Sequence, residues 1–201
     1  MKISILTSGN SRGSNFLAIY EYFKKNNIDI NIEYVIVTEA TAPIVSLAKE
    51  RDIEIVYYSN KNIKLNLFLI ETFRNNPVDL IVLAGFMRKL TPIFFESITT
   101  PLINIHPSLL PKFGGKGMYG MHVHQAVFEA GETKSGATVH YVNQNYDEGE
   151  IIMQKECDIS FCASPDEVGR EVLKIEHEIY PLAIMSINRS GDLRSPTFVG
   201  N

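Results

Sequence analysis

The chain has 201 residues, of which 45% are hydrophobic and 21% charged, and its formal net charge is -4. This length suits one large domain, and no internal repeat or low-complexity block divides it. The mild acidity disfavours a nucleic-acid-binding protein, because such proteins carry a clustered basic excess that contacts the phosphate backbone.

The apolar runs are short. The run at the start of the chain is too brief for a signal-peptide core, and none elsewhere is long enough to span a bilayer, so we expect a cytoplasmic protein with no membrane partner. Cys157 and Cys162 are five residues apart with no second pair. This spacing predicts reduced thiols rather than a disulfide or a metal site.

Short apolar runs alternate with segments of helical periodicity through the first half of the chain. Strands are predicted at 2–6, 32–38, 54–58, 79–85 and 102–105, and helices at 15–25, 42–51, 65–75 and 91–98. Continuous apolar strands separated by helices indicate a mostly parallel sheet that is covered on both faces.

The pattern changes in the second half. Residues 136–159 hold two strand-like runs joined through "NQNYDEGE" with no helix between them, which predicts an antiparallel pair. A long helix is expected from Ser164 to Ile187, with Ser164 as N-cap, Pro165 at the first helical position and a kink at Pro181. The predicted fold class is therefore α/β, a doubly wound, mostly parallel sheet with an antiparallel extension. We expect a single domain over 1–188 and a polar tail over 189–201.

The first predicted strand leads into the glycine-containing turn "SGNSRGSN". Gly9 and Gly13 allow a tight turn, and the backbone N–H groups at the following helix start can bind a phosphate. Ser14 and Asn15 would add side-chain donors, and Arg12 a positive charge. The alternative is a purely structural turn in which Asn15 caps the helix. The glycine spacing of dinucleotide-binding loops is absent, which disfavours a dinucleotide cofactor.

Polar side chains end the apolar strand "LINIH". Asn104 and His106 are two residues apart, so they face the same side of the strand at the sheet edge where ligands bind in parallel sheets. A hydrogen-bonded structural histidine is the alternative. Asp147 lies in the turn "NYDEGE", where it could serve turn chemistry alone; close to His106, it would raise the pKa of the imidazole. Together the three side chains are suited to acyl transfer to a substrate amine without a metal.

Two further histidines, His122 and His124, resemble a metal pair. They are expected near the start of a helix, where side chains two residues apart point in different directions, so no metal site is predicted.

Five segments of the chain, in order, resemble the phosphoribosylglycinamide formyltransferase family. They are "SGNSRGSN", "DLIVLAGFMRKLTP", "LINIHPSLLPKFGG", "HVHQAVFEAGETKSGATVHYVNQNYDEGEII" and "EHEIYPL", within Lys2 to Ile187. The resemblance implies a Rossmann-like formyltransferase fold. It also implies transfer of a formyl group from the co-substrate 10-formyltetrahydrofolate to the amine of glycinamide ribonucleotide, a step of purine (IMP) biosynthesis that needs no metal.

The resemblance also implies residue roles. His106 would be the general acid, Asp147 would raise its pKa, and Asn104 would stabilise the tetrahedral intermediate, with His140 supporting the site by hydrogen bonding. The ribonucleotide would contact Gly13, Ser14, Asn15 and Glu176. The folate would contact Met87, Arg88, Lys89, Leu90, Asn104, Asn143, Gln144, Asn145, Tyr146 and Asp147. Lys116 and Tyr119 would either close over substrate or extend a surface loop.

Two other functions remain open from the sequence. One is a related formyltransferase that acts on an amino sugar nucleotide or an aminoacyl-tRNA. The other is a non-catalytic ligand-binding α/β module, which would not need Asn104, His106 and Asp147 to converge. The partners expected for the favoured function are two small molecules, with the chain as a monomer or homodimer.

Overall fold

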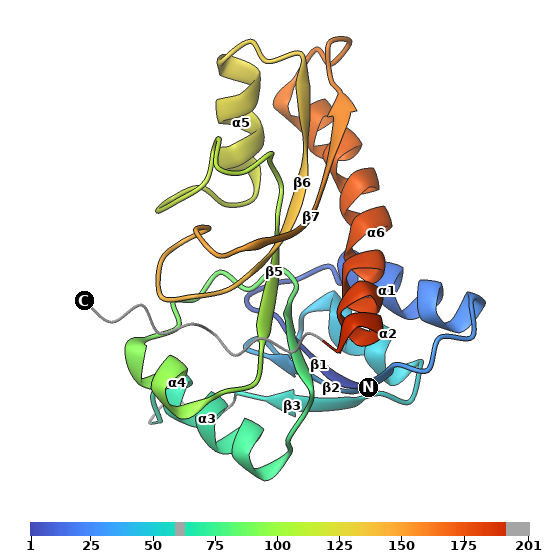
Figure 1. Ribbon diagram of the computed structural model, residues 1–201, viewed down its shortest axis with the longest axis vertical. Coiled ribbons are helices and arrows are strands. Elements are labelled where there is room, and N and C mark those ends of the chain that lie inside the picture. The colour runs from blue at the N-terminus through green and yellow to red at the C-terminus, as the bar shows by residue number, and fades with distance from the viewer. Residues whose placement is uncertain (59–62, 192–201) are drawn as a thin grey trace.

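One seven-stranded sheet organises the molecule (Figure 1). The computed structural model describes residues 1–58 and 63–191. The strands are β1 (Lys2–Leu6), β2 (Asn31–Val37), β3 (Glu54–Tyr57), β4 (Leu80–Leu83), β5 (Leu102–His106), β6 (Lys134–Tyr141) and β7 (Ile151–Asp158), in the spatial order β3-β2-β1-β4-β5-β6-β7. The chain turns to opposite sides after β1 and after β4, so the two neighbouring strands mark the topological switch point of a doubly wound sheet.

Five strands are parallel and the extension is antiparallel, as predicted. The parallel pairings join β3, β2, β1, β4 and β5, whereas β6 pairs antiparallel with both β5 and β7. The register of the β5–β6 pair places Asn104 opposite His140 and His106 opposite Thr138. The antiparallel extension therefore brings a second set of polar side chains to the end of β5.

The helices form two layers because successive strand residues point to opposite faces. On one face, Ile3 and Ile5 pack in a core that includes buried residues of four helices; on the other, Leu6 packs with the remaining two. The first layer holds α1 (Ser14–Lys25), α2 (Pro43–Lys49), α5 (Met121–Glu129) and α6 (Pro165–Ser190), and the second holds α3 (Leu65–Asn75) and α4 (Pro92–Ser97).

Helix α6 begins as the sequence predicts. Ser164 adopts extended backbone and accepts a hydrogen bond from the Glu167 N–H at 3.3 Å, and Pro165 occupies the first helical position. The helix continues through Pro181 to Ser190 and ends at Gly191, whose φ of 64° terminates it in the left-handed region. The last turn thus includes the first two residues of the expected polar tail, and 192–201 lie outside the described residues. The kink at Pro181 stays a prediction.

Helix α1 differs in detail from the prediction. It begins at Ser14, one residue early, and the N-cap position is Gly13 with no side-chain cap. The alternative in which Asn15 caps this helix is therefore wrong, and the Asn15 amide is free for other contacts. Across residues 1–58 and 63–191, no helix has the length and apolarity that a membrane crossing requires.

Candidate active site

A cavity of about 350 Å³ opens where β4 and β5 end. Loops after both strands, the first turn of α1, the loop before α5, the turn between β6 and β7, and α6 all line it. Every residue of the predicted folate-binding set lines this cavity, as do Lys116 and Tyr119. Of the predicted ribonucleotide set, Asn15 and Glu176 line the cavity, whereas Gly13 and Ser14 do not appear among its lining residues.

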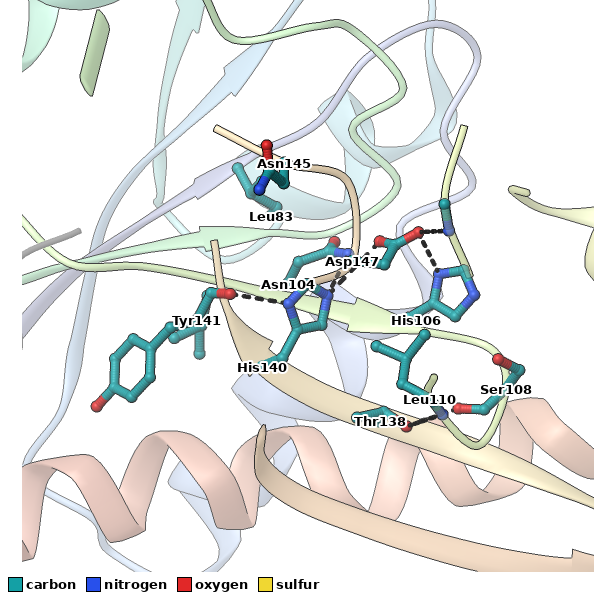
Figure 2. Close-up of polar contacts among 12 residues, drawn as sticks. Leu83, Asn104, His106, Ser108, Leu110, Thr138, His140, Tyr141, Asn145 and Asp147 are labelled. Carbon is teal, nitrogen blue, oxygen red and sulfur yellow. Dashed lines mark hydrogen bonds and ion pairs between the residues drawn. The ribbon is translucent and has the colours of Figure 1, made fainter. Parts of the chain in front are cut away.

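His106 and Asp147 meet at this edge, on segments 41 positions apart (Figure 2). His106 Nδ1 lies 3.5 Å from Asp147 Oδ2. On the other side of the ring, Nε2 lies 2.8 Å from the carbonyl oxygen of Phe113. A carbonyl only accepts, so Nε2 carries a proton and donates it there. Nδ1 is consequently the ring atom left to exchange a proton next to the carboxylate.

The Asp147 carboxylate is held by the backbone as well. Its Oδ2 accepts a hydrogen bond from the Gly115 N–H at 2.9 Å, and its side chain is only 13% exposed. Asp147 itself has a φ of 58°, in the left-handed region that Asp tolerates better than most residues. The turn between β6 and β7 therefore turns this side chain towards β5.

His140 orients Asn104. The His140 Nδ1 lies 2.8 Å from the Tyr141 carbonyl and must donate to it, so in the neutral ring Nε2 is an acceptor. Asn104 Nδ2 donates to this Nε2 at 3.3 Å (Figure 2). Burial lowers the pKa of His140 below its usual value. The ring is therefore neutral near pH 7, and its 3.8 Å approach to Asp147 is not an ion pair. One amide hydrogen of Asn104 is fixed by this bond while the other remains for a ligand.

A second polar pair lies on the α1 and α6 side of the cavity. Asn15 Nδ2 donates to Glu176 Oε2 at 2.7 Å. Burial raises the pKa of Glu176 to about 7, although the bond from Asn15 acts in the opposite direction. Asn15 Oδ1 is buried and has no hydrogen-bond partner within the described residues. The pair therefore presents an unused acceptor and a carboxyl group that titrates near neutrality.

The glycine-containing turn after β1 offers backbone N–H groups, rather than side chains, as donors for an anion. Gly13 has a φ of 77°, and a Cβ there would lie 3.0 Å from Ile44, so both conformation and space require glycine. The Gly9 N–H already donates to Thr38 Oγ1 at 2.9 Å. The donors left for an anion are the first N–H groups of α1, which have no intrahelical partners. Arg12 is exposed beside them.

His122 and His124 lie in the first turn of α5, as predicted, and of these two only His124 is buried. No group of three or more His, Cys, Asp or Glu side chains among residues 1–58 and 63–191 is placed to hold a metal ion.

The family can now be assigned. The model of the formyl transferase family matches residues 1–184. The chain belongs to the formyl transferase family. Among its relatives, the phosphoribosylglycinamide formyltransferase of Haemophilus influenzae is 37% identical over 187 residues, which cover 91% of this chain and 85% of that protein. The motif resemblance is thereby confirmed.

A solved structure and a further relative support the same family assignment. The solved structure of a phosphoribosylglycinamide formyltransferase from Coxiella burnetii superposes with a TM-score of 0.82 at 34% identity, covering 98% of this chain and 90% of that one. A chloroplastic phosphoribosylglycinamide formyltransferase of Vigna unguiculata is 33% identical over 89% of this chain, which spans only 58% of that longer protein. The fold predicted from the sequence is that of the family.

Two backbone contacts of this site could not be predicted from the sequence. The Phe113 carbonyl contacts the side chain of His106, and the Gly115 N–H contacts that of Asp147. The only available signal was the "KFGG" run, whose two glycines indicate a tight turn without indicating where its peptide groups point.

Proposed function

We propose that the chain transfers the formyl group of 10-formyltetrahydrofolate to the amine of glycinamide ribonucleotide, producing formylglycinamide ribonucleotide and tetrahydrofolate in purine biosynthesis. One observation carries the proposal: Asn104, His106 and Asp147 converge in the cavity that the two predicted folate segments also line. The relatives named for this activity support it. They do not favour the amino sugar nucleotide, the aminoacyl-tRNA or the non-catalytic alternative.

His106 moves the proton in the proposed reaction. The substrate amine forms a bond to the formyl carbon, the bond from that carbon to N10 of the folate breaks, and a proton passes from the amine to N10. Because His106 Nε2 stays bonded to the Phe113 carbonyl, Nδ1 is the atom that would carry this proton. Asp147, 3.5 Å away, would balance the imidazolium charge.

Asn104 stabilises negative charge on the formyl oxygen. Its second Nδ2 hydrogen is not used by His140 and would donate to the oxyanion. Because Nε2 of neutral His140 can only accept a hydrogen bond, the Asn104 amide is oriented with its nitrogen, rather than its oxygen, towards His140. His140 is thus proposed to support the reaction through Asn104.

The two substrates would contact different parts of the same cavity. The folate would contact the segments Met87–Leu90 and Asn143–Asp147, which lie on the same cavity. The ribonucleotide would contact Asn15 and Glu176, and its phosphate would bind the N–H groups at the start of α1 near Gly13 and Ser14. Lys116 and Tyr119 also line the cavity, which supports a role in closing over substrate.

A substrate comparison tests the proposal. Purified protein is incubated with 10-formyltetrahydrofolate and either glycinamide ribonucleotide or an amino sugar nucleotide, and release of tetrahydrofolate is followed spectroscopically. We expect turnover with glycinamide ribonucleotide but not with the amino sugar nucleotide, and this turnover should be lost in His106→Ala. Turnover only with the amino sugar nucleotide, or with neither acceptor, would contradict the assignment. The single domain over 1–188, the cytoplasmic location and the monomeric or homodimeric state remain predictions.

A further inference from the structure

The short turn Phe113–Gly115 contacts both His106 and Asp147, the two side chains proposed to act in proton transfer. Its first residue presents a carbonyl to His106 Nε2 at 2.8 Å, and its third presents an N–H to Asp147 Oδ2 at 2.9 Å. One turn thus supplies an acceptor to the imidazole and a donor to the carboxylate. This pairing suits each group, because the carbonyl selects the Nε2–H tautomer and the N–H stabilises the ionised carboxylate.

The backbone of this turn is held in an unfavourable conformation. Phe113 has a φ of 55°, which is uncommon for a bulky residue other than glycine. At Gly114, a Cβ would lie 2.6 Å from the Leu110 side chain and 3.3 Å from Asp147 Cβ. Strain of this kind persists only where surrounding contacts determine the backbone, and it concentrates at functional sites.

Thr138, on β6, fixes the loop that leads into this turn (Figure 2). Its Oγ1 donates to the Ser108 carbonyl at 2.6 Å and accepts from the Leu110 N–H at 3.1 Å. It also accepts from Gln154 Nε2 at 2.9 Å, and Gln154 in turn donates to the Leu110 carbonyl at 3.0 Å. One hydroxyl hydrogen and two lone pairs are all used.

The hydroxyl is also fully buried and directly opposite His106 in the β5–β6 register. The loop that it anchors begins at Pro107, immediately after His106, and leads into the strained turn. The connection from His106 to Phe113 is therefore fixed to β5 at its start and to β6 at Ser108 and Leu110. A shift of this loop would move the acceptor away from Nε2 and the donor away from Asp147 together.

We propose that Thr138 is a positioning residue that, through the turn Phe113–Gly115, sets the tautomer of His106 and the orientation of Asp147. This inference deepens the proposed function and rests on it for its kinetic part. It assigns no direct contact with substrate to Thr138. A purely structural role would change only the stability of the fold. The positioning role also determines which ring nitrogen of His106 carries the proton, and this can be observed directly.

The test compares Thr138→Val, which keeps the shape and removes the hydroxyl, with Thr138→Ser, which restores it. Ser135→Ala is the matched control, since Ser135 is a buried β6 residue whose Oγ has no partner within the described residues. The readouts are kcat and KM with both substrates, and the ring ¹⁵N resonances of His106, assigned through their loss in His106→Ala.

For Thr138→Val we expect kcat to fall about 10- to 100-fold, because small displacements of catalytic groups have costs of this size. The His106 resonances should change from one Nε2–H tautomer to a mixture. Thr138→Ser and Ser135→Ala should retain kcat within about threefold and the wild-type tautomer.

Folded Thr138→Val with wild-type kcat and an unchanged tautomer would overturn the proposal. Should that variant not fold, Gln154→Leu at an exposed position removes two bonds of the same network, and unchanged kcat and resonances there would overturn it equally. The resonances need no substrate. If the wild-type protein does not formylate glycinamide ribonucleotide but Thr138→Val still shows the tautomer change, the proposed function is refuted and the positioning role is supported.

Discussion

Glu176 makes the stability of the fold depend on pH in a direction opposite to most carboxylates. Its pKa rises from 4.5 to about 7 because the side chain is buried, while Asn15 gives only partial compensation. The folded state therefore binds a proton that the unfolded state releases near pH 4.5. The associated stability is complete below about pH 4.5 and is lost as the pH rises through about 7.

The size of the effect follows from the two pKa values. At about 1.4 kcal/mol for each pKa unit, the difference amounts to about 3 kcal/mol in the free energy of unfolding when both states are ionised. About 2 kcal/mol of this should be lost between about pH 5 and pH 7. Glu176→Gln removes the titration and keeps a neutral side chain that can bind Asn15. Its stability relative to wild type should therefore increase by about 2 kcal/mol over the same interval.

Urea unfolding of both proteins at several pH values between about 5 and 8 measures this difference. Burial lowers the pKa of His140 in the folded state, so this group makes the fold less stable as the pH falls. Glu176 has the opposite effect, and wild-type data alone would therefore mix the two trends. The subtraction of the two proteins removes the histidine contribution. Glu178→Gln, an exposed carboxylate of the same helix, controls for the loss of one charge. A difference between wild type and Glu176→Gln that stays constant within about 0.5 kcal/mol would refute the argument.

Three other substitutions follow from the site. His106→Ala should reduce kcat about 100- to 10,000-fold with native circular dichroism, and near-normal turnover would remove its role as proton carrier. Asn104→Ala should reduce kcat about 100- to 1,000-fold by removing the oxyanion donor, and a variant that changes only the KM for folate would instead indicate a binding role. Gly149→Ala should abolish or severely reduce folding, measured as soluble yield and thermal unfolding, because its Cβ would lie 1.7 Å from the Tyr141 carbonyl oxygen; a stable variant would contradict the close approach.

The fold could be predicted because its signals are local. Runs such as "LIVL" at β4 are buried on both faces, and the absence of a helix between β6 and β7 identified the antiparallel pair. The N-cap of α6 was also specified by neighbouring residues, Ser164 and Pro165. The helix ends were less certain because they depend on capping geometry, as the αL conformation of Gly13 shows for α1.

The candidate site was predictable only in its side chains. Asn104 and His106 could be paired from strand periodicity, whereas Asn15 and Glu176 are 161 positions apart and no periodicity joins them. The Phe113 and Gly115 contacts use peptide groups whose direction is set by tertiary anchoring. Such groups leave no side-chain signal, which explains why the acceptor of His106 could not be identified in advance.

The antiparallel extension explains why the polar site forms at the end of β5 and not at the other strands. In a purely parallel sheet the neighbour of β5 would also end at this edge and contribute a loop. Because β6 runs the other way, it passes alongside β5 and places His140 opposite Asn104 and Thr138 opposite His106. Each residue of β5 that is proposed to act on substrate thereby has a fixed partner within a strand. We infer that reversal of this one strand is what allows the side chains to be held rigidly while the surrounding loops bind the two substrates.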